Sequence, residues 1–229
     1  LLDKISEKKW PNISQELNKF SNTNTMLFKK IKVLLADWTS ENILIDETGA
    51  ARVNLDNLKT IFEKSSLLTI NIIGKIIQTV GGKEFPPKRK KTLNLIRTLF
   101  YSNFRNKTLG NVKIFKKNNY LFFLRELRNL NFNMEIRKDK NYIFDGRFII
   151  VSSKSGNLIS SNGNDISKFS NKHPFFKYRD IINNTIPCLR TLEGSCIKPH
   201  LNVIEVNSNI HEKLNQKSFS LYLINKVLV

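Results

Sequence analysis

Cysteine and long apolar runs are both scarce in this sequence, and each shortage excludes a class of protein. Two cysteines among 229 residues do not make a disulfide framework, so we expect a reducing compartment. The best apolar stretch, residues 66–80, is interrupted by Asn71, Lys75 and Gln78. A helix that spans a membrane needs about 20 predominantly apolar residues, and the sequence predicts none.

Acidic residues are also scarce, and their shortage suggests the kind of partner. The chain has 38 Lys and Arg against 19 Asp and Glu, a net charge of +19 and a pI near 10. Residues 81–150 alone hold 17 basic and 5 acidic side chains. A local excess of this size predicts a polyanionic partner, with nucleic acid first and a membrane surface second.

Codon bias is an alternative explanation of the positive charge, one that involves no ligand. The chain has 29 Asn, and its 28 Lys outnumber its 10 Arg, which is the bias of an AT-rich genome such as that of an organelle. Such a bias would produce a solvated, lysine-rich surface with no ligand. It would also spread the lysines evenly along the chain, and they are concentrated in the middle third.

The hydrophobic pattern predicts an α+β fold, with two small α/β subdomains behind a mainly helical N-terminal extension. Apolar residues recur at three- and four-residue steps from Asn57, and Gly81-Gly82 ends that helix. Pro86-Pro87 then marks a boundary. We expect a helical extension over 1–85, a basic α/β subdomain over 86–151 and a strand-rich subdomain over 152–229.

Within the basic subdomain we expect helix, strand, helix, strand and strand. The expected elements are a helix over 92–101, a basic loop over 103–111, a strand over 112–114, a helix over 120–130, and strands over 132–136 and 147–151. For the last third we expect an exposed loop or flexible link over 152–173, a strand-like run over 175–178 and one or two helical turns over 179–185. A strand and a tight turn over 187–194 and strands at 201–206 and 221–229 should follow.

Residues 102–133 resemble one known family, the bacterial-type small-subunit ribosomal protein number eight. The matched segments are Ser102-Asn103-Phe104 on the family's Arg-Asn-Ala, Val112-Lys113-Ile114 on Val-x-Val, Phe115 to Asn118 on Pro-Tyr-Ser-Lys, and Leu127 to Asn133 on the end of its second helix. Further along, Thr191 and Gly194 match two positions of the family's Ser-Thr-Ser-Lys-Gly motif.

The resemblance implies a divergent organellar form of this family. Its function would be that of a structural constituent of a mitochondrial small ribosomal subunit in the matrix, which binds and stabilises small-subunit rRNA. No enzymatic activity and no cofactor are expected. The N-terminal extension would contact neighbouring ribosomal proteins.

Basic charge and the resemblance together name the residues expected on rRNA. Lysine and arginine would displace counterions from phosphates, and polar side chains would fix the register. We expect Lys116, Lys117 and Asn118 to present the N-terminus of the helix over 120–130 to RNA. The whole expected set is Lys88, Arg89, Lys90, Lys91, Asn103, Arg105, Asn106, Lys107, Lys113, Lys116, Lys117, Asn118, Thr191 and Gly194.

Other functions remain open on the sequence alone. The chain would also suit another organellar ribonucleoprotein, an intron-encoded endonuclease or maturase, or an assembly protein that meets only proteins. A zinc site would need Cys188, Cys196, His200 and His211, whose spacing lacks the usual short pairs. A nuclease-like magnesium site would need Glu135, Asp139 and Asp145, which more naturally solubilise a turn. No phosphate-binding glycine motif or nucleophile elbow is present.

Overall fold

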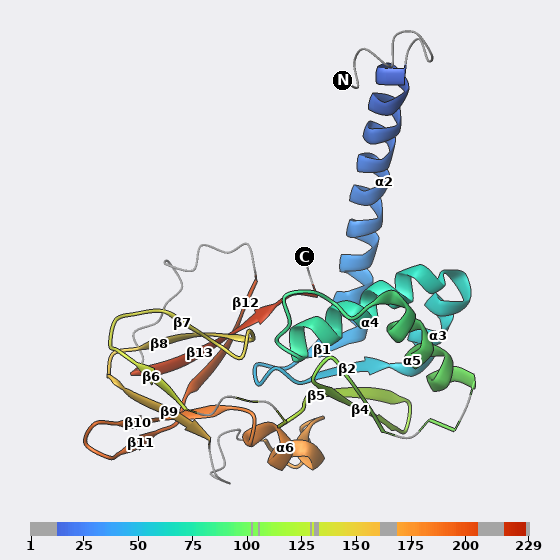
Figure 1. Cartoon of the computed structure of the whole chain (residues 1–229). Coiled ribbons are helices and arrows are strands. Elements are labelled where there is room, and N and C mark those ends of the chain that lie inside the picture. Colours follow the sequence, from blue (N-terminus) through green and yellow to red (C-terminus); the bar gives the residue numbers. More distant parts are fainter. Residues whose placement is uncertain are drawn as a thin grey trace. The chain divides into compact units, whose positions relative to one another are not determined.

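A computed structural model describes residues 13–101, 103–104, 106–128, 130, 133–160, 169–205 and 218–227 (Figure 1). The chain divides into two units, residues 1–41 and residues 42–229. Helix α2 (Ile13–Asn42) accounts for the described part of the first unit. Its Phe20, Met26 and Val33 are exposed. The helical character expected of this segment is confirmed.

Among the helices that the structure describes, none is both long and apolar enough to cross a membrane.

A five-stranded sheet organises the first half of the second unit. Its spatial order is β1 (Ile43–Ile45), β2 (Ala51–Asn54), β5 (Tyr120–Arg125), β4 (Val112–Lys117) and β3 (Lys107–Leu109). All neighbours in this sheet are antiparallel. Asn118 sits in the β4–β5 turn with a φ of 51°, a conformation that Asn tolerates better than most residues.

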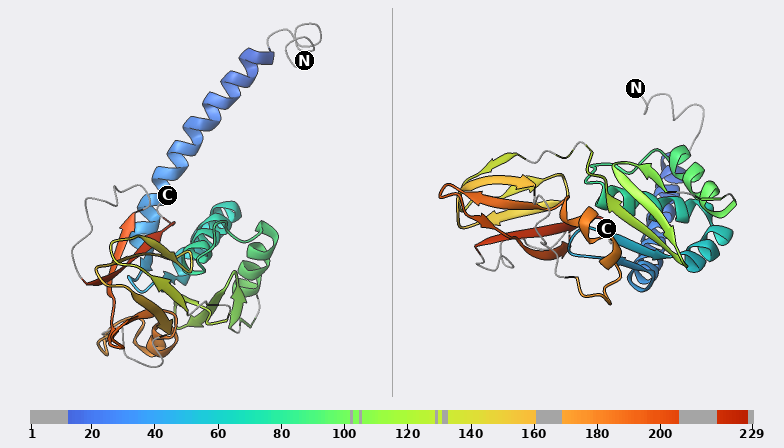
Figure 2. Two further views of the ribbon diagram at one scale, coloured as in Figure 1. Left: turned by 60° about the vertical axis from the view of Figure 1, so that its left-hand side comes forward. Right: turned by 90° about the horizontal axis from the view of Figure 1, so that it is seen from below.

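Three helices connect β2 to β3 and cover one face of this sheet. They are α3 (Leu55–Lys64), α4 (Ser66–Val80) and α5 (Arg89–Tyr101). Figures 1 and 2 show all three on the same side, where Ile76, Ile77 and Ile96 are buried. Asn54 caps α3, and Ser65 separates α3 from α4 by capping the second helix through Leu68 N–H.

The opposite face of the sheet borders a second core. Phe122 and Leu124 of β5 belong to one apolar cluster with Phe175, Ile182 and Leu221. The short helices η1 (Phe176–Tyr178) and α6 (Arg179–Asn183) lie on this side, and α6 contacts β5. Because both faces of β5 are covered, five of its six residues are buried.

Two four-stranded sheets form the rest of the second unit. One has the order β11 (Cys196–Ile197), β10 (Pro187–Thr191), β9 (Gly156–Ser160) and β6 (Met134–Ile136). The other has the order β12 (His200–Glu205), β13 (Phe219–Asn225), β8 (Phe148–Ser152) and β7 (Tyr142–Phe144). Only β12 and β13 run parallel among these strand pairs. The α+β class is therefore confirmed.

Four expected elements are wrong. Residues 107–109, inside the expected basic loop over 103–111, form strand β3, which pairs with β4. Residues 120–125 form strand β5 instead of the start of a helix, because β2 and β4 flank them and both faces are covered. Residues 176–178 form a 3-10 helix instead of a strand. Part of the expected exposed loop, residues 156–160, pairs with β10 and β6 as strand β9.

The expected domain boundaries fall inside one unit. Residues on both sides of 85/86 and of 151/152 belong to the unit that begins at residue 42. The Pro86-Pro87 segment is the connection between α4 and α5, and Val151 lies within β8. The proline pair therefore marks the start of a helix inside a sheet crossover.

Candidate nucleic-acid interface

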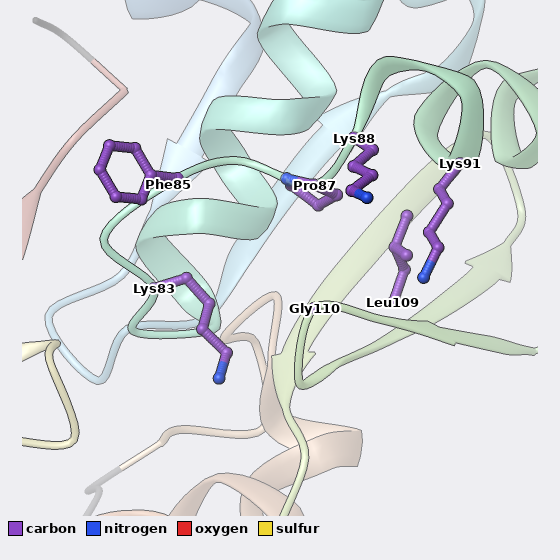
Figure 3. A pocket seen from close by; sticks show the side chains of 7 residues that line it. All are labelled: Lys83, Phe85, Pro87, Lys88, Lys91, Leu109 and Gly110. Atoms are coloured by element: carbon purple, nitrogen blue, oxygen red, sulfur yellow. The ribbon is translucent and has the colours of Figure 1, made fainter.

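The loop between α4 and α5 forms one wall of a small basic hollow. The hollow has a volume of about 190 Å³ and is open to solvent (Figure 3). The β3–β4 turn and the first turn of α5 complete it. Its lining consists of Lys83, Phe85, Pro87, Lys88, Lys91, Leu109 and Gly110.

Close glycine contacts fix the start of this loop. A Cβ on Gly81 would collide with the carbonyl oxygen of Gly110, and one on Gly82 would collide with that of Asp145. Gly82 also has a φ of +64°, which favours glycine. The end of α4 therefore packs directly against two turns, one of which belongs to the hollow.

Hydrogen bonds fix the remainder of the loop. Lys83 N–H donates to the carbonyl of Gln78 at 3.1 Å, and the Gln78 side-chain amide donates to the carbonyl of Glu84 at 2.5 Å. The Lys226 ammonium, from the segment after β13, donates to the carbonyl of Lys83 at 2.8 Å. The backbone beside the hollow is thus held from two sides.

The first turn of α5 carries an electrostatic conflict. Lys88, Arg89, Lys90 and Lys91 are all exposed at the N-terminal end of the helix, and no acidic residue lies in its first turn. The helix dipole is positive at that end, so cations there destabilise the helix by about 0.3–1 kcal/mol each. Among the described residues no carboxylate forms a salt bridge with any of these four side chains.

A second pair of lysines lies on the other side of the sheet. Lys117 on β4 and Lys177 on η1 interact through their side chains, and this interaction lowers the pKa of Lys117. Phe115 and Tyr178, whose ring centroids are 5.3 Å apart, lie beside the pair. Nearby, Arg52 stacks over the ring of Tyr120 at 4.5 Å. Two adjacent cations with aromatic neighbours suit a phosphate ligand.

The structure brings only some of the expected residues together. Lys88 and Lys91 line the hollow, with Arg89 and Lys90 beside them on α5. Lys107 also approaches α5, since its ammonium donates to the Thr98 hydroxyl at 3.3 Å. Asn103 and Asn106 are exposed between α5 and β3, and Arg105 lies outside the described residues.

Lys116, Lys117 and Asn118 do not lie at a helix N-terminus, as expected, because no helix follows them. They form the end of β4 and the turn into β5, and Lys113 lies on the same strand. Any contribution of Lys116 and Lys117 to RNA binding would come from their charge, without a helix dipole.

Thr191 and Gly194 lie apart from the hollow, on the β10–β11 hairpin. Thr191 is buried, and its hydroxyl lies 2.7 Å from that of Ser195 within the turn. Gly194 is exposed with a φ of +85°. Their contact with RNA stays a prediction.

Sequence reasoning missed Lys83, Phe85 and Lys177. Phe85 precedes the proline pair that predicted a domain boundary, and Lys83 lies two residues before it, so a basic and an aromatic residue beside two prolines were visible as a signal. Nothing local to Lys177 indicates its position, because its meeting with Lys117 depends on the fold.

The two metal sites considered from the sequence have no support here. Within the described ranges no three His, Cys, Asp or Glu side chains are grouped to hold a metal ion, and His211 lies outside these ranges. Asp145 instead forms salt bridges with Arg125 and Arg147. Cys188 is buried, which raises the pKa of its thiol, and Cys196 is exposed beside it.

In comparisons with known proteins, no protein-family model, no curated protein and no solved structure matches this chain.

Proposed function

We propose that this chain is an RNA-binding module that holds a folded RNA by its phosphates. The observation that carries the proposal is the first turn of α5, where four exposed cations lie at the positive end of a helix and form no salt bridge within the part of the chain that the structure describes. This arrangement weakens the free protein, and a bound phosphate would remove the penalty. Helix N-terminal N–H groups and lysines are both common phosphate donors.

Three features support RNA as the polyanion. The hollow adds apolar surface to the lysines, which suits a nucleotide better than a bare anion. The lysine pair on the opposite side of the sheet offers a second phosphate contact. The net charge of +19 would speed association with any polyanion.

The narrower prediction, a constituent of the mitochondrial small ribosomal subunit, depends on the resemblance at residues 102–133. The expected helix over 92–101 and strand over 112–114 are present, while β5 replaces the start of the second helix. Since one of the matched segments, residues 127–133, was assigned to the end of that helix, our proposal stops at RNA binding. The same module would equally serve an enzyme that acts on RNA.

Fluorescence anisotropy with a panel of labelled RNAs tests the proposal. The panel contains a fragment of the central domain of small-subunit rRNA, an unrelated folded RNA of equal length, and a blunt duplex. We expect binding with a steep salt dependence. A preference for the rRNA fragment would support the ribosomal prediction, and equal binding to both folded RNAs would count against it.

A pair of charge reversals locates the interface. Lys88→Glu with Lys91→Glu should weaken binding at least about tenfold, because each change removes an attraction and adds a repulsion. The log–log salt slope should fall by about 2. The matched control is Lys138→Glu with Lys140→Glu, in the exposed turn between β6 and β7. Equal weakening by the control pair would contradict the proposed position.

A further inference from the structure

Phe85 is an aromatic side chain that the fold leaves in solvent. It is 72% exposed, while Phe123, Phe148 and Phe175 are completely buried. Large apolar side chains are ordinarily drawn into a core, and an exposed aromatic residue among cations is a frequent feature of nucleic-acid surfaces. The position of this ring therefore needs an explanation.

Flexibility of the α4–α5 loop does not explain why the Phe85 side chain is exposed. Gln78 and Lys226 hold the carbonyls of Glu84 and Lys83, the two residues before the ring. On the other side, Pro86 packs against α4, where a Cβ on Gly74 would lie 3.4 Å from the Pro86 Cβ. Phe85 also precedes a proline, which restricts its backbone to extended conformations. The backbone that carries the ring is thus held on both sides.

The surroundings of the ring match the two halves of a nucleotide. The hollow that Phe85 lines contains the apolar side chains of Pro87 and Leu109. Three lysines line the same hollow, and Figure 3 shows Lys91 beside Leu109, Lys88 beside Pro87 and the ring of Phe85 at the other end of the lining. A base offers a flat apolar face, and the phosphates attached to its sugar offer negative charge.

We propose that Phe85 stacks on an unpaired base of the bound RNA while Lys83, Lys88 and Lys91 contact the adjoining phosphates. This inference rests on the proposed RNA-binding function and specifies its partner. The bases of a continuous duplex are stacked on one another and hide their faces. The RNA must therefore present a loop, a bulge or an unpaired end at this point.

An anionic membrane surface is the rival partner for an exposed ring beside lysines. The shape of the site favours RNA, because the lysines and the ring line a concave hollow, which a bilayer surface does not enter. Stacking also benefits from a held backbone, which the loop supplies.

The test uses two RNAs with the same number of phosphates, a blunt duplex and a hairpin with an unpaired overhang. Phe85→Ala should weaken binding of the overhang RNA by about 5- to 150-fold and leave the blunt duplex unaffected. Phe85→Trp should keep the affinity, and its fluorescence should be quenched by the overhang RNA beyond the signal from the two native tryptophans. Ile143→Ala, at another exposed apolar position, is the control.

The outcomes separate this inference from the proposed function. If both RNAs bind the native chain and Phe85→Ala changes neither affinity, the stacking role is overturned and RNA binding stands. If the native chain binds neither RNA, both proposals fail. If Phe85→Ala reduces binding to vesicles that contain anionic lipid and leaves overhang RNA unaffected, the membrane is the partner and the inference is overturned.

Discussion

Two groups of cations in this protein have opposite environments. At the start of α5, Lys88 to Lys91 are exposed and have no acidic partner in the helix's first turn. At the end of β5, the side chains of Arg125 and Arg147 are 2% and 0% exposed, and each forms a 2.7 Å salt bridge with Asp145. One group lacks counter-charge and the other shares a single carboxylate.

Arg147 of the buried group stays charged at neutral pH. Burial lowers the pKa of Arg147 to about 10, and the charge of Asp145 opposes this effect. The Arg147 guanidinium also donates to the carbonyl of Thr185 at 2.5 Å. Arg125 donates to the carbonyls of Asn111 and Glu126 at 3.2 and 2.7 Å. These bonds connect the five-stranded sheet to the β7–β8 turn and to the chain before β10.

Positive charge has a different effect in each of the two groups. Where the counter-charge is internal, as at Asp145, the cations join parts of the fold. Where it is absent, as at α5, the cations lower stability and remain available to an external anion. Three changes test this distinction.

Asp145→Asn should have the largest effect, a loss of about 3–5 kcal/mol in the free energy of unfolding, because it leaves two buried guanidiniums without counter-charge. Asp145 has a φ of 53°, which Asn tolerates, so the change isolates the charge. Urea denaturation measures the loss. Asp139→Asn, at an exposed position with a φ of 57°, is the control. A loss below about 1 kcal/mol at position 145 would contradict the role of the cluster.

Gly82→Ala should come next, because Gly82 is where the two regions touch. Its new Cβ would collide with the Asp145 carbonyl and lie 3.0 Å from Arg147 Cγ. Overpacking and the positive φ together should cost about 2–4 kcal/mol. The loss of stability is measured by thermal denaturation. The control is Gly194→Ala, where φ is also positive and nothing lies within 4 Å of the added Cβ. Equal losses would show that backbone strain alone matters.

Lys90→Glu should have the smallest effect and the opposite sign. An acid in the first turn of α5 should stabilise the chain by about 0.3–1 kcal/mol, because it complements the helix dipole. The same change should weaken RNA binding. Stability by urea denaturation and affinity by anisotropy are measured on one preparation. A variant that is both less stable and unchanged in RNA binding would refute the proposed trade-off.

The local hydrophobic pattern predicted helix α5 correctly. It gave the wrong structure for β5, whose conformation depends on the strands and helices that pack around it. The three- and four-residue steps of Leu93, Ile96 and Leu99 have one interpretation, since this helix covers only one face of a sheet. Leu121, Leu124 and Leu127 show similar steps, yet β5 is a strand covered on both faces and therefore shows no alternation. Short apolar runs of this kind do not distinguish a helix from a buried strand.

Only the part of the candidate site that is continuous in sequence was predictable. A run such as Lys88 to Lys91 next to a proline pair is visible in the sequence, and its place at a helix start follows from it. The contact between Lys117 and Lys177 joins segments 60 residues apart along the chain, so no local signal predicts it. Asp145 was considered as a magnesium ligand in the sequence. Its salt bridges show a different role, and the one to Arg125 was not visible locally because 20 residues separate the two.

The bond from Lys226 to the loop before α5 has a consequence for biosynthesis. Lys226 also donates its N–H to the hydroxyl of Thr79 at 3.0 Å, a contact that closes a separation of 147 residues. A nascent chain can form α4 and α5 long before the ribosome adds residue 226. During that interval the loop beside Phe85 lacks one of its two clamps. The proposed stacking of Phe85 on a base would thus become available late in translation, after the lysines proposed to contact phosphates have been synthesised.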